Sequence, residues 1–226
     1  MGNSLKGWTI LFDLDGTLVE TAPDLVVALN HVLGEIDLPP LPLAEVRNMI
    51  GHGAKAMIQA GLRANDTELD DAQLERMWES FLAHYTANIS VKSHAYEGCV
   101  AALEDLSARG AVLAVCTNKP QGLSEQLIDE LGMSPHFAAI VGSDAVPNKK
   151  PHGDHILLTV QKAGGIPSRA IMVGDSETDE KAAQNAGLPF IFVPFGYASG
   201  TADTISSHAV VHHFSDLVSA ILAITA

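Results

Sequence analysis

Four short and almost wholly apolar runs, with a weaker fifth, alternate with stretches of helical length, and this alternation constrains the fold of the 226-residue chain most strongly. A strand is apolar throughout when both of its faces are buried. Strands that alternate with helices build a parallel sheet covered by helices. The sequence therefore predicts an α/β fold with a doubly wound parallel sheet. The runs are residues 8–12, 111–116, 137–141 (the weaker one), 170–173 and 189–193.

The stretches between these runs have helical periodicity, and four of them end at a glycine, which is a common C-terminal signal. We expect helices at residues 98–109, 121–131, 152–163 and 179–186, with a closing helix at 214–224.

The alternation is interrupted between the first two runs, where about 70 residues show helical periodicity and no convincing strand. Thr21-Ala22-Pro23-Asp24 is typical of a helix start, with a capping hydroxyl, an early proline and an acid in the first turn. Residues 69–88 form a long second helical pattern. We therefore expect an α/β core built from residues 1–18 and 93–226, and an inserted all-helical domain over residues 19–92.

The net charge of −14, from 13 basic and 27 acidic residues, excludes several partners. A protein that binds the phosphate backbone of nucleic acid needs a basic surface, and an anionic membrane attracts the same kind of surface. No apolar run approaches the ~18 residues that span a bilayer. The start of the chain lacks the apolar stretch of a signal peptide, and two cysteines make no disulfide framework. We expect a cytoplasmic protein with reduced thiols that binds neither nucleic acid nor membrane.

Polar side chains follow the expected strands at the edge where an open parallel sheet binds its ligands. Asp13 and Asp15 alternate with apolar neighbours, so they point to one side, and Asp175 adds a third carboxylate. Converging carboxylates of this kind suit Mg²⁺. Gly16 allows backbone N–H groups to approach an anion closely. The remaining polar residues of this edge are Thr17, Thr117, Asn118, Lys150, Ser176 and Asp179.

Several of these residues also have a purely structural interpretation. Asn118 fits a phosphate contact and a helix N-cap equally well, and Ser176 with Asp179 matches a capping box. Lys150 follows an expected strand and precedes a proline, whereas Lys149 is expected to be a solvated surface residue.

Taken together, the segments resemble the four motifs of the haloacid dehalogenase superfamily, in particular its phosphatase branch with a helical cap. The resemblance covers nearly the whole chain. One departure is Gly153, which stands where a second proline commonly follows Lys150-Pro151. The matching segments are Asp13-Leu14-Asp15-Gly16-Thr17-Leu18-Val19, Thr117-Asn118-Lys119, Lys150-Pro151 and Gly174-Asp175-Ser176-Glu177-Thr178-Asp179.

The resemblance implies a Mg²⁺-dependent phosphomonoesterase. Asp13 would be the nucleophile that forms an aspartyl-phosphate, and Asp15 the acid and base. Asp13, the backbone carbonyl of Asp15 and Asp175 would hold Mg²⁺. Thr117 and Lys150 would bind the phosphoryl group with help from Asn118, Gly16 and Thr17, while Asp179 and Ser176 would support the site.

Within that branch the chain resembles phosphoglycolate phosphatases, on Gly51-His52-Gly53, the segment 195–197 and the overall length. The resemblance favours a small phosphate ester, 2-phosphoglycolate above others, with His52 and Arg47 as candidate contacts to a substrate carboxylate. A monomer or a homodimer is expected. Two alternatives stay open: a sugar phosphomutase with the same intermediate, and a non-catalytic binding protein on this fold.

Overall fold

The computed structural model describes residues 4–47, 49–50, 53–197 and 204–226. The chain divides into two compact units, which are described separately. The core unit comprises Met1–Glu20 and Ala95–Ala226, and the helical unit comprises Thr21–His94.

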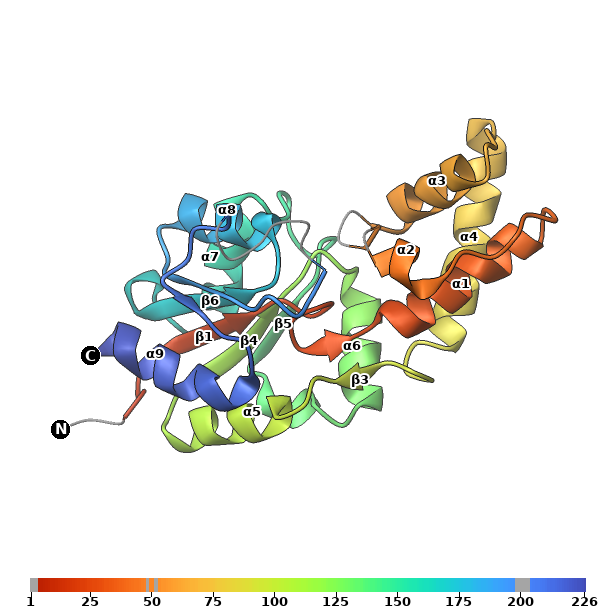
Figure 1. Ribbon diagram of the computed structural model, residues 1–226. Coiled ribbons are helices and arrows are strands. Elements are labelled where there is room, and N and C mark those ends of the chain that lie inside the picture. The colour runs from red at the N-terminus through yellow and green to blue at the C-terminus, as the bar shows by residue number, and fades with distance from the viewer. Residues whose placement is uncertain (1–3, 48, 51–52, 198–203) are drawn as a thin grey trace. The chain divides into compact units, whose positions relative to one another are not determined.

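The core unit is built on a six-stranded sheet with the order β5-β4-β1-β6-β7-β8, and every neighbouring pair is parallel (Figure 1). β1 lies inside the sheet, with Phe12 level with Val115 of β4 and Val173 of β6. The predicted α/β fold with a parallel sheet is therefore confirmed. The strands are β1 (Thr9–Phe12), β4 (Val112–Cys116), β5 (Ala139–Val141), β6 (Ala170–Gly174), β7 (Phe190–Phe192) and β8 (Ala209–Val210).

Helices cover both faces of this sheet, with α7 and α8 on one side and α5 and α9 on the other (Figure 1). The helices of the core unit are α5 (Cys99–Ala108), α6 (Gln121–Glu130), α7 (Gly153–Lys162), α8 (Glu177–Ala186) and α9 (Leu217–Thr225). Helix α8 begins two residues before the expected start, because Ser176 is its N-cap and forms a capping box with Asp179.

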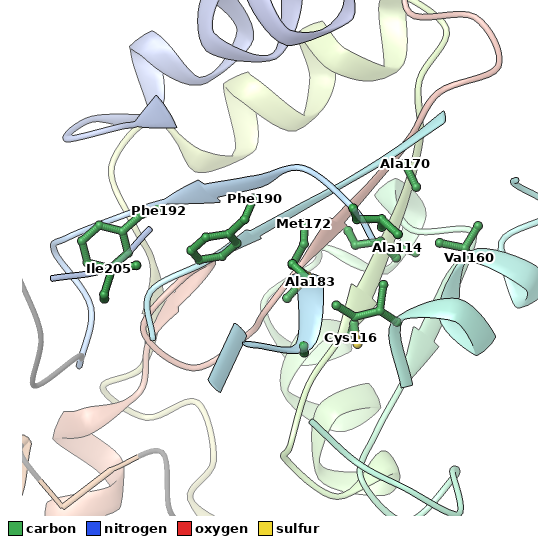
Figure 2. Packing of buried hydrophobic residues seen from close by; sticks show 13 residues of the cluster. Ala114, Cys116, Val160, Ala170, Met172, Ala183, Phe190, Phe192 and Ile205 are labelled. Atoms are coloured by element: carbon green, nitrogen blue, oxygen red, sulfur yellow. The ribbon is translucent and has the colours of Figure 1, made fainter. Parts of the chain in front are cut away.

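The core between the sheet and helices α7 and α8 explains why the strands are apolar throughout. Leu11 and Met172 of the sheet belong to one buried cluster with Ile156 of α7 and Ala183 of α8. Figure 2 shows Met172 beside Ala183 within this cluster. The next residue of β1 on either side of Leu11 is also fully buried, because the second layer of helices covers the other face. Burial on both faces stabilises the sheet by roughly 1.5–3 kcal/mol for each large side chain.

Three short strands were not predicted from the sequence: β2 (Val19–Glu20), β3 (His94–Ala95) and β8. β2 and β3 pair with each other in a two-stranded sheet. Each of the three strands is two residues long, so none contains a periodic pattern that sequence reasoning can detect.

The helical unit contains α1 (Ala22–Gly34), α2 (Leu43–Arg47), α3 (Ala54–Ala64) and α4 (Asp71–Ala87). Pro23 lies in the first turn of α1 as expected, but the hydroxyl of Thr21 makes no capping hydrogen bond. Asp24 instead accepts hydrogen bonds from the backbone of Lys92 and Ser93 at 2.7–3.1 Å. This buried carboxylate ties the start of α1 to the end of the same unit.

Both cysteines are buried free thiols, and burial raises the pKa of Cys99 and Cys116 to about 12. In the part of the chain that the structure describes, no helix has the length and apolar character needed to span a membrane.

Candidate active site at the carboxyl edge of the sheet

The parallel strands deliver the polar segments to one edge of the core unit. Asp13 follows β1 directly, and its N–H donates to the carbonyl of Val173 in β6 at 3.0 Å. Thr117 follows β4, and Asp175 follows β6. Lys150 lies in the connection between β5 and α7. Because these strands are neighbours that run in one direction, the residues after them meet at the same edge.

Lys150 is the centre of an ion triplet in which Lys150 and Asp179 are fully buried and Asp13 is partly exposed. Its ammonium lies 3.0 Å from Oδ1 of Asp13 and 2.6 Å from Oδ1 of Asp179. The second oxygen of Asp179 accepts hydrogen bonds from the hydroxyl and the N–H of Ser176 at 2.6 and 3.2 Å. Burial by itself lowers the pKa of Lys150, but the charges of Asp13 and Asp179 outweigh it and raise the pKa overall. The lysine is therefore held as a cation beside Asp13.

Asp175 is fixed by two hydrogen bonds from opposite ends of the core unit's sequence. The hydroxyl of Thr17 donates to Oδ1 at 3.0 Å, and the N–H of Tyr197 donates to Oδ2 at 2.6 Å. Two glycines make room for this carboxylate. A Cβ atom would lie 2.5 Å from Oδ2 of Asp175 at Gly16, where φ is +84°, and 2.2 Å from it at Gly196.

Asp13, Asp175 and Asp179 each place a carboxylate oxygen within 4.8 Å of the others. Burial raises the pKa of Asp13 to about 6, with Lys150 opposing that rise, and burial raises the pKa of Asp175 well above its ordinary value. Crowded, buried carboxylates of this kind are stabilised by a cation, and all-oxygen donors suit Mg²⁺. Both oxygens of Asp179 are already engaged by Lys150 and Ser176. Asp13 and Asp175 are therefore better placed to act as direct metal ligands.

Asp15 has a partner that sequence reasoning missed. The ammonium of Lys119 lies 3.0 Å from one oxygen of Asp15 and 3.3 Å from the other. The side chain of Lys119 is 4% exposed and that of Asp15 is 20% exposed. Lys119 belongs to the segment Thr117-Asn118-Lys119 but received no role from the sequence. The only available signal was its position two residues after Thr117.

Thr117 and Asn118 flank this pair. Thr117 is 1% exposed, and its Oγ1 accepts a hydrogen bond from the N–H of Lys119 at 3.2 Å. Asn118 does not cap a helix, because α6 begins at Gln121 and Pro120 holds the N-cap position. The Asn118 amide instead donates to the carbonyl of Lys150 at 2.9 Å, and its Oδ1 is buried without a hydrogen-bond partner.

Two residues that follow Lys150 in the sequence, Gly153 and His155, have structural roles. His155, fully buried, accepts a hydrogen bond at Nδ1 from the N–H of Lys150 at 3.3 Å, while its Nε2 lies 3.1 Å from the carbonyl of Val141. Burial lowers the pKa of His155 to about 4. At Gly153 a Cβ atom would lie 2.7 Å from the backbone N of Ala186, so α7 approaches α8 closely at this position.

Two of the predicted site residues belong to the helical unit and not to the core unit. Arg47 is the last residue of α2 in the helical unit. His52 lies outside the described residues.

Comparison with known proteins gives a consistent picture. The family model for haloacid dehalogenase-like hydrolases matches residues 10–193. A phosphoglycolate phosphatase of Caulobacter vibrioides is 44% identical over 98% of this chain and 94% of its own. A phosphoglycolate phosphatase of Mesorhizobium japonicum is 43% identical over 92% of both chains. A crystal structure described as a predicted phosphoglycolate phosphatase from Haemophilus somnus superposes with a TM-score of 0.89 and 30% identity, covering 100% of each chain. The chain therefore belongs to the haloacid dehalogenase-like hydrolase family.

Proposed function

We propose that this protein is a Mg²⁺-dependent phosphomonoesterase that hydrolyses a small phosphate ester, with 2-phosphoglycolate as the favoured substrate, through an aspartyl-phosphate intermediate. The observation that carries the proposal is the buried Lys150 ammonium 3.0 Å from Asp13, within a group of three carboxylates. The substrate is supported by the relatives named phosphoglycolate phosphatase.

In the first step an oxygen of Asp13 attacks phosphorus. The new bond joins this oxygen to phosphorus, and the bond from phosphorus to the leaving oxygen breaks. Asp15 gives its proton to that oxygen, so the alcohol leaves neutral at the hydroxyl. In the second step Asp15 takes a proton from water, whose oxygen attacks the same phosphorus. The bond between the Asp13 oxygen and phosphorus breaks, inorganic phosphate leaves, and the carboxylate of Asp13 is restored.

The phosphoryl group needs positive charge and hydrogen-bond donors, because its oxygens carry the charge of the transition state. Lys150 supplies the cation, and Asp179 holds its ammonium in place. The Thr117 hydroxyl and the Asn118 side chain extend this donor set, as do the backbone N–H groups of Gly16 and Thr17.

Asp13, the backbone carbonyl of Asp15 and Asp175 are the proposed Mg²⁺ ligands, with Asp179 and Ser176 in support. When bound, Mg²⁺ offsets the repulsion between an anionic nucleophile and an anionic ester. The hydrogen bonds from Thr17 and Tyr197 orient Asp175 for this role.

We propose further that residues 19–92 form a cap that selects the substrate, while residues 1–18 and 93–226 perform the chemistry. Arg47 and His52 are the candidate contacts from the cap to a substrate carboxylate.

Release of inorganic phosphate from a panel of esters tests the proposal, with 2-phosphoglycolate, sugar phosphates, nucleotides and pyrophosphate as substrates. We expect turnover of 2-phosphoglycolate that EDTA abolishes and Mg²⁺ restores. Asp13→Asn should lower turnover by at least about 10³-fold with unchanged circular dichroism. The matched control is Asp129→Asn at an exposed site, which should behave as the wild type. Isomerised ester without phosphate release, or turnover indifferent to EDTA, would contradict the proposal.

A further inference from the structure

We propose that Lys119 is a specificity-determining residue: its ammonium binds an anionic group on the leaving part of the substrate. The substrate class is then the phosphate esters of short 2-hydroxy carboxylates. This inference rests on the proposed function and adds a contact from the core unit to those proposed from the cap.

The backbone of Lys119 is held firmly at the end of β4. Its N–H donates to Oγ1 of Thr117 at 3.2 Å, and its carbonyl accepts from the N–H of Ser143 at 3.1 Å. A Cβ atom at Gly142 would lie 2.8 Å from this carbonyl, so the strand that precedes Ser143 packs tightly against the segment. Because the main chain is fixed, the ammonium is confined to the region that the side chain can reach.

Asp15 lies within that region. Because the side chain of Lys119 is buried, its positive charge interacts strongly with anions there. The side chain is 4% exposed, so water screens the ammonium poorly. Placing a lysine in such a site carries a desolvation cost. Asp15, in its ionised form, offsets part of this cost. When Asp15 carries the proton that it gives in the first step, the ammonium is able to bind a second anion at this position.

The two buried lysines, Lys150 and Lys119, contact different carboxylates of the site. Lys150 lies 3.0 Å from Asp13, the residue that bonds to phosphorus, and so serves the transferred group. Lys119 lies 3.0 Å from Asp15, the residue that must reach the leaving oxygen. A proton donor works at about 2.6–3.2 Å, which places the leaving oxygen within roughly 6 Å of the Lys119 ammonium. A carboxylate on the carbon attached to that oxygen falls inside this range.

The balance of charge at the edge agrees with this assignment. Four carboxylates face two ammonium groups, so four formal negative charges against two positive leave −2. With a divalent cation bound and all four carboxylates ionised, the sum would be zero, and the proton that Asp15 carries in the first step raises it to +1. Removing Lys119 would take one positive charge from the position beside Asp15 at which the carboxylate of the ester would bind.

The test pairs a change in the enzyme with the same change in the substrate. Lys119→Met removes the ammonium, and 2-hydroxyethyl phosphate replaces the carboxylate of 2-phosphoglycolate by a neutral group. We expect Lys119→Met to lower kcat/KM for 2-phosphoglycolate at least about 30-fold more than for 2-hydroxyethyl phosphate, the size of a lost charge-assisted contact. Lys149→Met, at the exposed lysine beside Lys150, is the matched control and should leave the ratio of the two esters unchanged.

Lys119→Gln separates the cation from the support of Asp15, because an amide can still donate to that carboxylate. It should show the same loss of discrimination, and it replaces Lys119→Met if that variant does not fold. Equal losses on both esters would overturn the inference, since Lys119 would then act only through Asp15. A wild-type protein that releases phosphate from neither ester would instead refute the proposed function.

Discussion

Asp13→Asn should make the metal-free protein more stable at neutral pH while it removes the nucleophile. Burial raises the pKa of Asp13 from 3.8 to about 6, the ammonium of Lys150 opposes the rise, and the charge of Asp179 adds to it. The ionised carboxylate is therefore destabilised in the folded protein relative to the unfolded chain. Asparagine has nearly the same shape and stays neutral, so it resembles the protonated aspartic acid.

The sign and the size of the change in stability follow from this shift in the pKa of Asp13. Between pH 3.8 and about 6 the native protein keeps a proton on Asp13 that the unfolded chain has released. The contribution of Asp13 to stability is therefore complete below pH 3.8 and is lost as the pH rises through 6. The expected gain from Asp13→Asn is less than about 1 kcal/mol at pH 4, about 2 kcal/mol at pH 5 and about 3 kcal/mol at pH 7 and above.

Urea unfolding in EDTA, followed by circular dichroism between pH 4 and 8, measures this difference. With an m-value of about 2 kcal/mol/M, the midpoint of Asp13→Asn should lie about 1.5 M above that of the wild type at pH 8. Added Mg²⁺ should stabilise the wild type more than the variant and so reduce the difference. The exposed Asp129→Asn is the control and should leave the urea midpoint at its wild-type value. A difference that is constant with pH, or a less stable variant at pH 8, would refute the reasoning.

Two other substitutions test the scaffold of the site and the helical unit. Gly196→Ala puts a Cβ atom 2.2 Å from Oδ2 of Asp175, so the Mg²⁺ concentration for half-maximal activity should rise at least about tenfold. Gly122→Ala, where a Cβ atom meets nothing within 4 Å, is its control, and equal Mg²⁺ titrations for both variants would contradict the prediction. Asp24→Ala leaves the buried N–H and hydroxyl of Ser93 and the N–H of Lys92 without their acceptor, and should cost about 3–5 kcal/mol in urea unfolding. A loss below about 1 kcal/mol would show that water replaces the carboxylate.

The sequence predicted the sheet well because a strand that is buried on both faces is apolar throughout, and this pattern is visible in the local sequence. The expected runs at 8–12, 111–116, 137–141 and 189–193 each contain an observed strand, and the run at 170–173 coincides with β6 except that β6 ends one residue later, at Gly174. Hydrophobic pattern did not reveal β2, β3 or β8, because two paired residues are too few to show a period. The hydroxyl of Thr21 was expected to cap α1 and does not, because the helix start there uses proline and the contacts of Asp24.

Asn118 shows how a local pattern stays ambiguous. Its position before a helix suggested an N-cap as strongly as a ligand contact, and only the chain path excluded the N-cap. The helix begins at Gln121, and the Asn118 amide donates to Lys150, 32 residues away.

The sequence by itself determined the fold class and most of the polar residues at the edge, since each of these residues is placed by the strand that it follows. The tertiary structure alone decided which of these side chains pair. Lys119 meets Asp15 across 104 residues, and Tyr197 meets Asp175 across 22. Such pairs depend on strand order, on the rotamers that packing permits and on glycines that leave space, as Gly196 does beside Asp175. Strand order, rotamers and the space beside a glycine produce no periodic pattern in the sequence, because they depend on residues that are neighbours in space and not along the chain.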